Sequence, residues 1–384
     1  MDPIHLMIIY TGILIFVGYL YFCADPSGSG PLSILARFGF ESLPAFFWKA
    51  TEKIIGKRGK DRLAGIFDYV INQRNPLLQI FYLVLMSGGY MCIVLFAYPR
   101  VPNHVLGTEH RVYGGIVMAT CLVSWFVACR VEPGILTKRN LQMYDNYELD
   151  DILYEGQDCR TCKFKKIARS KHCAVCNMCI SRFDHHCAWI NQCVGEKNYR
   201  FFLAFLLIHA ISLLYGGLMM GLLLFDTVLD KRLMDVRYMN KITGKVEDAS
   251  YMMVSKYLMF YDGTICALMA ICVVMGVVLL GFFFYHLSLV RRNVTTNENF
   301  KWHQYTRAYR YALREHEEKL AAEKSKKGEN GDLKTRVQMP PFPSNIYRRS
   351  LFQNVMEVLH PRCYRKRIET PKASPKTTKK QKTQ

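Results

Sequence analysis

The sequence predicts an all-α polytopic membrane protein of about five transmembrane helices, with a Cys-rich segment inserted between the third and the fourth. Two observations predict this class. Five long apolar runs alternate with polar stretches along the 384 residues, and half of the 14 cysteines lie between Cys159 and Cys193. Buried helices of a soluble protein explain the runs less well, because five of them would leave too little polar surface to cover the molecule.

Each apolar run is long enough to cross a bilayer. A hydrocarbon core about 30 Å thick needs roughly 20 mostly apolar helical residues. The runs, none with Lys or Arg at its centre, are Ile4–Cys23, Leu77–Tyr98, Val112–Cys129, Phe201–Phe225 and Thr264–Val290. The first has neither the positively charged start nor an evident small-residue cleavage site of a signal peptide, so we predict a retained helix.

These runs divide the chain into five parts. They are an N-terminal helix with a linker (1–76), a pair of membrane helices (77–130), the Cys-rich segment (131–200), a second pair of membrane helices joined by a loop (201–290) and a basic tail (291–384). Within the linker, Pro44–Ile55 predicts either an amphipathic helix on the membrane surface or a packed loop. Residues 299–327 predict a polar, basic helix, and no internal repeat is apparent.

The formal charge of +20 predicts an orientation in the membrane. Most of the 51 Lys and Arg residues fall in the segments 24–76, 130–200 and 291–384. Positively charged loops stay in the cytosol, so we expect a lumenal N-terminus, with the Cys-rich segment and the tail in the cytosol. The glycosylation sequon Asn293-Val-Thr295 would then face the cytosol and remain unused.

A basic chain with Cys pairs could also be a zinc module that binds nucleic acid. The apolar runs argue against this class, and the Cys-rich segment has no aromatic-rich surface on which bases could stack. We therefore expect no nucleic acid as a partner. The reducing cytosol disfavours a disulfide framework, which leaves metal binding or catalysis for the clustered cysteines.

The Cys-rich segment has the ligand spacing of zinc sites. Cys-x2-Cys pairs form turns that offer two thiolates to one tetrahedral ion. The candidate ligands are Cys159, Cys162, His172, Cys173, Cys176, Cys179, His185, His186, Cys187 and Cys193. Two sites of three Cys and one His would use six Cys and two His. One Cys and one His are left over, and the spacing alone does not say which.

A spare Cys beside a spare His and an Asp is the composition of an activated thiol nucleophile. A nearby imidazolium favours the reactive thiolate, and a carboxylate orients the imidazole. The stretch RFDHHCAWINQC (Arg182 to Cys193) places such residues side by side. The alternatives are a purely structural zinc module, in which the extra Cys and His are incidental, and a membrane adaptor without catalysis.

The string Asp184-His185-His186-Cys187, set between two predicted membrane helices, resembles the DHHC family of protein S-acyltransferases (palmitoyltransferases). The resemblance covers the spacing of every Cys in the segment and continues to Gly195, Asn198 and Phe202. Weaker family marks are Glu132-Pro133-Gly134, Thr295-Thr296-Asn297-Glu298 and Asn345-x-Tyr347, whereas Ile167 stands where the family usually has Pro.

This resemblance implies the roles of the residues. One structural zinc ion would be held by Cys159, Cys162, His172 and Cys179, and a second by Cys173, Cys176, His186 and Cys193. Cys187 would take a palmitoyl group from palmitoyl-CoA as a thioester, with His185 as general base and Asp184 as its orienting partner. The acyl group would then pass to juxtamembrane cysteines of membrane-associated proteins.

The resemblance also implies where the acyl donor lies. The acyl chain would enter the four helices from residue 77 onward, with Trp189 near the thioester and Ser212 near the far end. Lys166, Arg169 and Lys171 are candidate partners of the CoA phosphates, or they contact membrane lipids as surface charge. The extra first helix and the string EPGILTKRN resemble an endoplasmic-reticulum branch, so we expect a membrane of the endoplasmic reticulum or Golgi.

Overall fold

A computed structural model describes residues 30–239, 244–327 and 341–364. Within these ranges, four helices are long and apolar enough to cross a membrane: Leu77–Arg100, Glu109–Arg130, Tyr199–Asp230 and Gly263–Arg292. They confirm four of the predicted apolar runs as helices. The fifth, Ile4–Cys23, lies outside the described residues.

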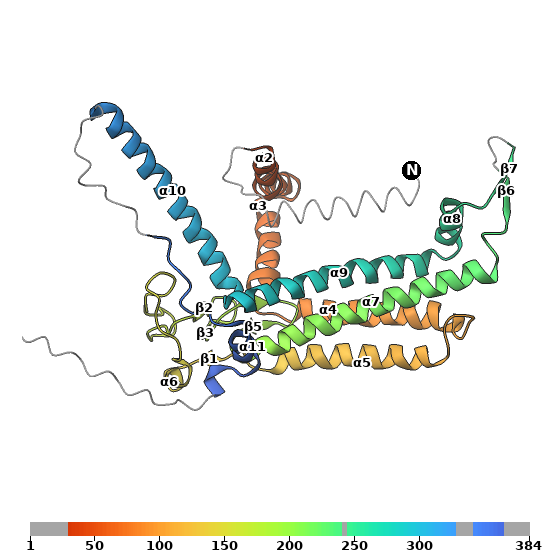
Figure 1. The fold of residues 1–384 in the computed structure, drawn as a ribbon, viewed down its shortest axis with the longest axis horizontal. Helices are drawn as coiled ribbons and strands as arrows, with labels where there is room; N and C mark the ends of the chain where they lie inside the picture. The colour runs from red at the N-terminus through yellow and green to blue at the C-terminus, as the bar shows by residue number, and fades with distance from the viewer. Residues whose placement is uncertain (1–29, 240–243, 328–340, 365–384) are drawn as a thin grey trace, which may run out of the picture.

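The four long helices form one bundle (Figure 1). They are α4 (Leu77–Cys92, continued to Arg100), α5 (Glu109–Arg130), α7 (Tyr199–Asp230) and α9 (Gly263–Arg292). The helices α7 and α9 approach closely because each places a glycine in the contact. A Cβ atom at Gly217 would lie 2.6 Å from Cγ2 of Val273, and one at Gly276 would lie 2.9 Å from the side chain of Leu214. Small residues of this kind allow membrane helices to pack backbone against backbone.

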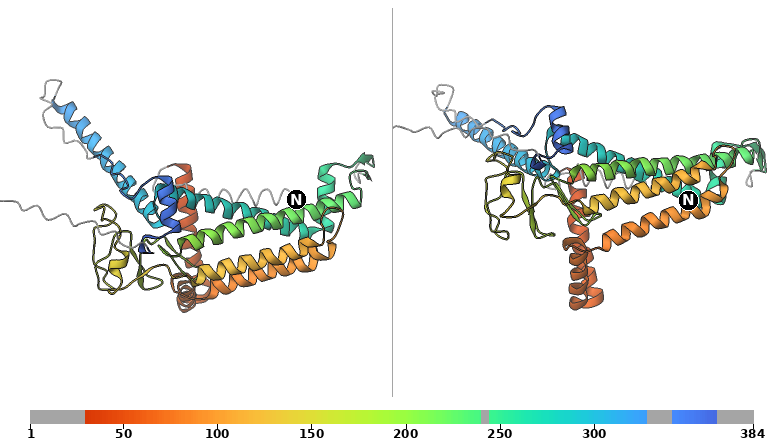
Figure 2. Two further views of the ribbon diagram at one scale, coloured as in Figure 1. Left: turned by 60° about the horizontal axis from the view of Figure 1, so that its bottom comes forward. Right: turned by 90° about the horizontal axis from the view of Figure 1, so that it is seen from below.

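Polar parts of the chain lie at opposite ends of the bundle (Figures 1 and 2). At one end, α8 (Tyr251–Tyr261) and the hairpin of β6 (Arg237–Met239) and β7 (Val246–Asp248) connect α7 to α9. At the other end lies the Cys-rich segment, which connects α5 to α7. This separation is what a bilayer around the bundle requires, since the polar backbone of loops cannot sit in hydrocarbon.

The Cys-rich segment adds short strands that the all-α prediction did not include. The strands β1 (Ile135–Leu136), β2 (Lys171–Cys173) and β3 (Met178–Ile180) form an antiparallel sheet in the order β1-β3-β2. A separate hairpin pairs β4 (His185–Cys187) with β5 (Gln192–Val194). The helix α6 (Leu141–Tyr144) is a single turn. Strands of two or three residues carry little hydrophobic pattern, so periodicity cannot reveal them.

Further helices precede and follow the four bundle helices along the chain. The linker contains α2 (Pro31–Arg37), a short π-helix (Phe38–Ser42) and α3 (Leu43–Asn72), which bends at Gly56 where φ is 71°. The helix expected over Pro44–Ile55 is thus present, and the packed loop is wrong. In both figures α3 runs steeply across the end of the bundle that carries the Cys-rich segment.

The tail contains α10 (Thr296–Lys327), which confirms the helix predicted over 299–327. It also contains α11 (Leu351–Leu359), which begins with a capping box between Ser350 and Gln353, and a 3-10 turn (Arg362–Tyr364). The helix α11 packs on α9 and α7. The tail therefore returns to the junction between the bundle and the Cys-rich segment, where its last described Cys, Cys363, is buried.

Candidate active site and metal centres

Two clusters of Cys and His side chains lie in the Cys-rich segment. Their members are Cys159, Cys162, His172 and Cys179 in the first, and Cys173, Cys176, His186 and Cys193 in the second. The ligand atoms of each cluster lie within 4.8 Å of one another. A zinc ion with bonds of about 2.3 Å to sulfur and about 2.0 Å to nitrogen would separate its tetrahedral ligands by roughly 3.5 Å.

The measured separations fit zinc. Nδ1 of His172 lies 3.4–3.8 Å from the three sulfur atoms of its cluster. Nδ1 of His186 lies 3.3–3.9 Å from the sulfurs of the second cluster. Each cluster could therefore hold one zinc ion, with the membership that the family resemblance implies. Bound zinc would cross-link a segment of short strands that has little core of its own.

Strand geometry explains why neighbouring residues join different clusters. Successive side chains of a strand point to opposite faces. In β2, His172 therefore faces the first cluster and the adjacent Cys173 faces the second. His172 stands opposite Cys179 across β2 and β3, just as His186 stands opposite Cys193 across β4 and β5.

The two clusters repeat along the chain at an interval of 14 residues. Every ligand of the second cluster follows its counterpart by this interval, from Cys159 and Cys173 to Cys179 and Cys193. In each Cys-x2-Cys turn, the amide of the second Cys donates to the sulfur of the first at 3.4 Å. The expectation of no internal repeat is therefore wrong. The repeat is visible only in the ligands and turns, since the intervening residues differ.

The hairpin of β4 and β5 continues this interval with a third turn, which carries Cys187. Cys173 pairs with Met178 in one hairpin, and Cys187 pairs with Gln192 in the next. Both turns place an Asn at positive φ, 53° at Asn177 and 50° at Asn191.

The third turn lacks the partners of a metal site. The string CAWIN, from Cys187, matches CAVCN, from Cys173, except that Trp replaces Val and Ile190 replaces the second Cys. Fourteen residues after His186 and Cys193, the corresponding positions are Arg200 and Leu207 of α7. Neither of these side chains is a zinc ligand. Cys187 thus occupies a turn like that of Cys173, but without the other metal-ligand residues at the corresponding positions.

His185 and Asp184 stand beside this thiol. His185 and Cys187 share one face of β4, whereas His186 between them points to the other face. Nδ1 of His185 lies 2.7 Å from Oδ2 of Asp184, which leaves Nε2 for the sulfur. Asp184 is 2% exposed and also accepts hydrogen bonds from the amide and the hydroxyl of Thr296, at 2.7 and 2.8 Å.

These contacts determine the protonation of His185 and Asp184. Burial disfavours the imidazolium of His185, but its hydrogen bond to the Asp184 carboxylate and its interaction with Cys187 outweigh burial and raise the pKa of His185 to about 10. Burial likewise opposes ionisation of Asp184, whereas the bond and charge of His185 and the Thr296 amide keep its pKa below the usual value. The geometry therefore favours an imidazolium held between a carboxylate and a sulfur atom.

The comparisons with known proteins agree with this geometry. The sequence model described as DHHC palmitoyltransferase matches residues 152–303. Palmitoyltransferase ZDHHC4 of Mus musculus is 30% identical over 237 residues, which are 60% of this chain and 68% of that protein. The chain belongs to the DHHC palmitoyltransferase family.

Two fungal members of the DHHC family give a similar picture. Palmitoyltransferase SWF1 of Neurospora crassa is 30% identical over 71% of this chain and 64% of that protein. Palmitoyltransferase swf1 of Schizosaccharomyces pombe is 26% identical over 70% of this chain and 71% of that protein. The chain spans less than two thirds of the Neurospora protein and 55% of palmitoyltransferase swf1 of Emericella nidulans.

The sulfur of this DHHC family member faces the helical bundle. Cys187 is 7% exposed and packs in an apolar cluster that draws on all four long helices. Its neighbours in the cluster include Tyr82 of α4, Ala128 of α5, Phe202 of α7 and Val290 of α9. The ring of Phe202 also meets that of His185 edge-on, with 5.0 Å between centroids. The thiol is thus directed from the Cys-rich segment into the apolar interior.

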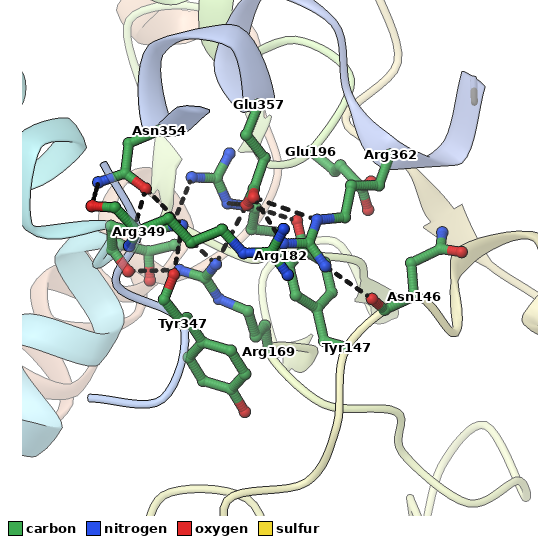
Figure 3. A network of polar contacts seen from close by, with 12 residues as sticks. Asn146, Tyr147, Arg169, Arg182, Glu196, Tyr347, Arg349, Asn354, Glu357 and Arg362 are labelled. Carbon is green, nitrogen blue, oxygen red and sulfur yellow. Dashed lines mark hydrogen bonds and ion pairs between the residues drawn. The ribbon is translucent and has the colours of Figure 1, made fainter. Parts of the chain in front are cut away.

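A buried network of charges joins the DHHC segment to the tail (Figure 3). Arg169 is fully buried, and its guanidinium donates to both carboxylate oxygens of Glu298 at 2.6 and 2.7 Å and to Oδ1 of Asn293 at 2.9 Å. It also lies over the rings of Tyr147 and Tyr347. The prediction that Arg169 binds a CoA phosphate is therefore wrong, because these groups occupy its donors and shield it from solvent.

Glu357 of α11 is the second acid of this network. It accepts from Arg362 at 2.8 Å and from the hydroxyl of Tyr147 at 2.9 Å, and it lies 3.5 Å from Arg169 and 3.8 Å from Arg182. Although burial opposes its charge, the surrounding guanidinium groups lower the pKa of Glu357 to about 2. Sequence reasoning missed it, because nothing local marks an acid in an amphipathic helix as the partner of distant arginines.

The two threonines of the family mark Thr295-Thr296-Asn297-Glu298 have different hydrogen-bond partners. The hydroxyl of Thr296 donates to Asp184, whereas that of Thr295 accepts from the amide of Glu298 at 3.1 Å. Asn293, the acceptor of the glycosylation sequon, is fully buried, and its amide donates to the carbonyl of Tyr347 at 2.8 Å. The buried position is a second reason to expect no glycan there.

The structure does not decide the role of the remaining predicted residues. Lys171 is exposed and donates to Oδ1 of Asn297 at 2.9 Å, and Lys166 is partly exposed. Trp189 is 45% exposed, and its carbonyl accepts from Nε1 of Trp125 at 3.1 Å. Ser212 is half-buried on α7. These four stay predictions for binding of the acyl donor.

Proposed function

We propose that this chain is a protein S-acyltransferase that moves a palmitoyl group from palmitoyl-CoA to cysteine thiols of membrane-associated proteins. One observation carries the proposal: the sulfur of Cys187, left without metal partners, lies beside a His185–Asp184 pair and faces an apolar bundle. A nucleophile, its proton carrier and apolar side chains of the four long helices thus meet at one atom. The names of the relatives agree with this activity.

In the first step, the thiolate of Cys187 attacks the thioester carbonyl of palmitoyl-CoA. The new carbon–sulfur bond to Cys187 forms as the bond to CoA breaks. The departing CoA thiolate takes the proton of the His185 imidazolium, so that neutral imidazole remains. Asp184 keeps the ring in place through Nδ1, and the bonds from Thr296 keep Asp184 in place.

In the second step, neutral His185 takes the proton of a substrate thiol. The resulting thiolate attacks the palmitoyl thioester, and Cys187 leaves as a thiolate beside the regenerated imidazolium. Both half-reactions use one proton carrier, and atoms and charge balance over the cycle. Burial of the acyl chain in the bundle contributes roughly 0.8 kcal/mol per CH₂, which favours a chain in the bundle over one in water.

The finer assignments belong to the same proposal. Lys166 and Lys171 would bind CoA phosphates, Trp189 would lie by the thioester and Ser212 near the end of the chain. The five-part division of the chain, a fifth helix over Ile4–Cys23, and a Cys-rich segment inserted on the cytosolic side complete it. The chain would reside in the endoplasmic reticulum or Golgi, and reachable substrates would carry juxtamembrane cysteines.

Labelling with the donor tests the activity directly. The full chain in detergent is incubated with alkyne-labelled palmitoyl-CoA and then treated with hydroxylamine, which cleaves thioesters. We expect a hydroxylamine-sensitive adduct on the wild type, none on Cys187→Ser, and an unchanged one on Cys363→Ser, whose buried thiol lies outside the apolar cluster of Cys187. Equal labelling of wild type and Cys187→Ser would contradict the proposal.

A further inference from the structure

A groove lined by two arginines opens where α9 ends and α10 begins. Its volume is about 210 Å³, and it is separate from the contacts of Cys187. Its lining includes Arg292, Asn299, Trp302, Thr306, Phe342 and Arg348. Three stretches of chain thus build it: the last residue of α9, the first turns of α10 and the segment before α11.

The described residues do not balance the charge of this groove. Among them, no Asp or Glu lines it. Within the described ranges, neither Arg292 nor Arg348 has an ion-pair partner, whereas the buried Arg169 and Arg362 bind Glu298 and Glu357. Arg292 makes two neutral contacts, to Oδ1 of Asn299 at 3.1 Å and to the carbonyl of Ser288 at 3.4 Å. Two guanidinium groups facing one hollow without a carboxylate are typical of a phosphate site.

The position of the groove indicates the source of the phosphate. Arg292 is the last residue of a helix that is long and apolar enough to cross a bilayer, so the groove lies where hydrocarbon gives way to headgroups. Its walls include Trp302 and Phe342, whose rings lie 6.1 Å apart. Aromatic side chains beside guanidinium groups suit a ligand with a charged phosphate and an apolar body.

We propose that this groove binds the phosphate of an anionic membrane lipid. Arginine is suited to this task because its planar fork gives two parallel hydrogen bonds to phosphate oxygens. The negative surface of a membrane also concentrates such lipids beside basic groups. The inference concerns binding alone, and it stands whether or not the chain transfers acyl groups.

Titration of the full chain in detergent tests the site. Native mass spectrometry would count bound dioctanoylphosphatidic acid, with dioctanoylphosphatidylcholine as the lipid without net charge. We expect the wild type to prefer phosphatidic acid, and Arg292→Gln with Arg348→Gln to bind it about tenfold more weakly, as for the loss of charge-assisted bonds. The matched control, Arg310→Gln with Arg314→Gln, removes the same charge from exposed positions on α10 outside the groove and should bind like wild type.

Three outcomes would overturn the inference. One is equal affinity of the wild type and the groove variant for phosphatidic acid. Another is equal loss in the control variant, which would indicate only general charge attraction. The third is displacement of phosphatidic acid by 3′,5′-ADP at lower concentration, which would assign the groove to the nucleotide of an acyl donor. Loss of zinc from the double variant would show that it is misfolded. The single variant Arg348→Gln, at an exposed position, would then be tested in its place, with weaker lipid binding expected.

Discussion

Cys173 and Cys187 hold the same position in successive hairpins, yet among the described residues only Cys173 belongs to a cluster of metal-ligand side chains. Cys173 has Cys176 three residues later and the next hairpin beside it, which adds His186 and Cys193. Cys187 has Ile190 three residues later and then a membrane helix. The comparison teaches that two turns with the same backbone form can differ in whether their first Cys has partners for a metal ion.

The side chains packed around the two sulfur atoms also differ. Cys173 packs with Ile180, Phe183 and Cys193 inside the Cys-rich segment. Cys187 packs with residues of the four long helices, on the face of β4 that it shares with His185. An equivalent turn therefore serves structure in one place and, in our proposal, chemistry in the other, according to what lies opposite.

The two adjacent histidines offer the largest test of this contrast. His186→Ala should lose the second metal and the fold of the segment, because structural zinc contributes about 10–16 kcal/mol in small zinc domains. His185→Ala should retain both metals and lose acyl transfer by roughly 10²–10⁴-fold, the usual contribution of a general acid or base. Metal analysis of the purified variants and labelling with palmitoyl-CoA would measure both.

The contrast would break if both variants lost zinc equally, since His185 would then also be a ligand. His303→Ala is a suitable control, because this His lies on α10 and belongs to neither cluster. It should change neither zinc content nor labelling.

Ile190→Cys should convert the third turn back toward the second. The variant would have two thiols in the spacing of Cys173 and Cys176, and such pairs bind soft metals. We expect labelling of Cys187 to fall about tenfold when zinc or cadmium is added and to recover with a chelator, because a metal-bound thiolate is a poorer nucleophile. Ile190→Ser matches the size of Cys without its thiol and should not respond to metal. Metal-independent labelling of Ile190→Cys would refute this interpretation of the turn.

Thr296→Val should weaken the site without touching either cluster. The change removes one hydrogen bond to the buried Asp184 carboxylate, and bonds to charged groups contribute about 1.5–3 kcal/mol. We expect acyl transfer to fall about tenfold with unchanged zinc content, and Thr296→Ser to restore it. Wild-type rates for Thr296→Val would show that Asp184 needs only the amide bond.

Ser212→Tyr should have the smallest effect, on selectivity rather than on rate. A large ring at the predicted end of the acyl space would favour shorter chains, as in other pockets where a methylene is worth 1–3 kcal/mol. Competition between labelled acyl-CoAs of 14 and 18 carbons would measure the preference, with Ser212→Ala as the control for loss of the hydroxyl. An unchanged preference would remove Ser212 from the acyl space.

Local and covalent features of this protein could be predicted without the structure. Four predicted apolar runs are helices in the structure. They could be predicted because length and composition alone decide whether a segment suits a bilayer. The eight members of the two clusters followed from a family motif and from ligand number. The interval of 14 residues was present in the sequence too, but its meaning depends on hairpin registers that strands of three residues do not reveal.

Contacts between distant segments required the tertiary structure. Arg169 resembled a phosphate partner because it stands among lysines, but folding buries it against Glu298 and Asn293, more than a hundred residues away. Glu357 and the groove beside Arg292 could not be predicted from the sequence either, because both depend on contacts between the tail and distant parts of the chain. The sequence by itself determined which of the described segments are apolar enough to enter a bilayer and which residues can hold metal. Only long-range packing decided which of the described charges pair with one another and which have no ion-pair partner.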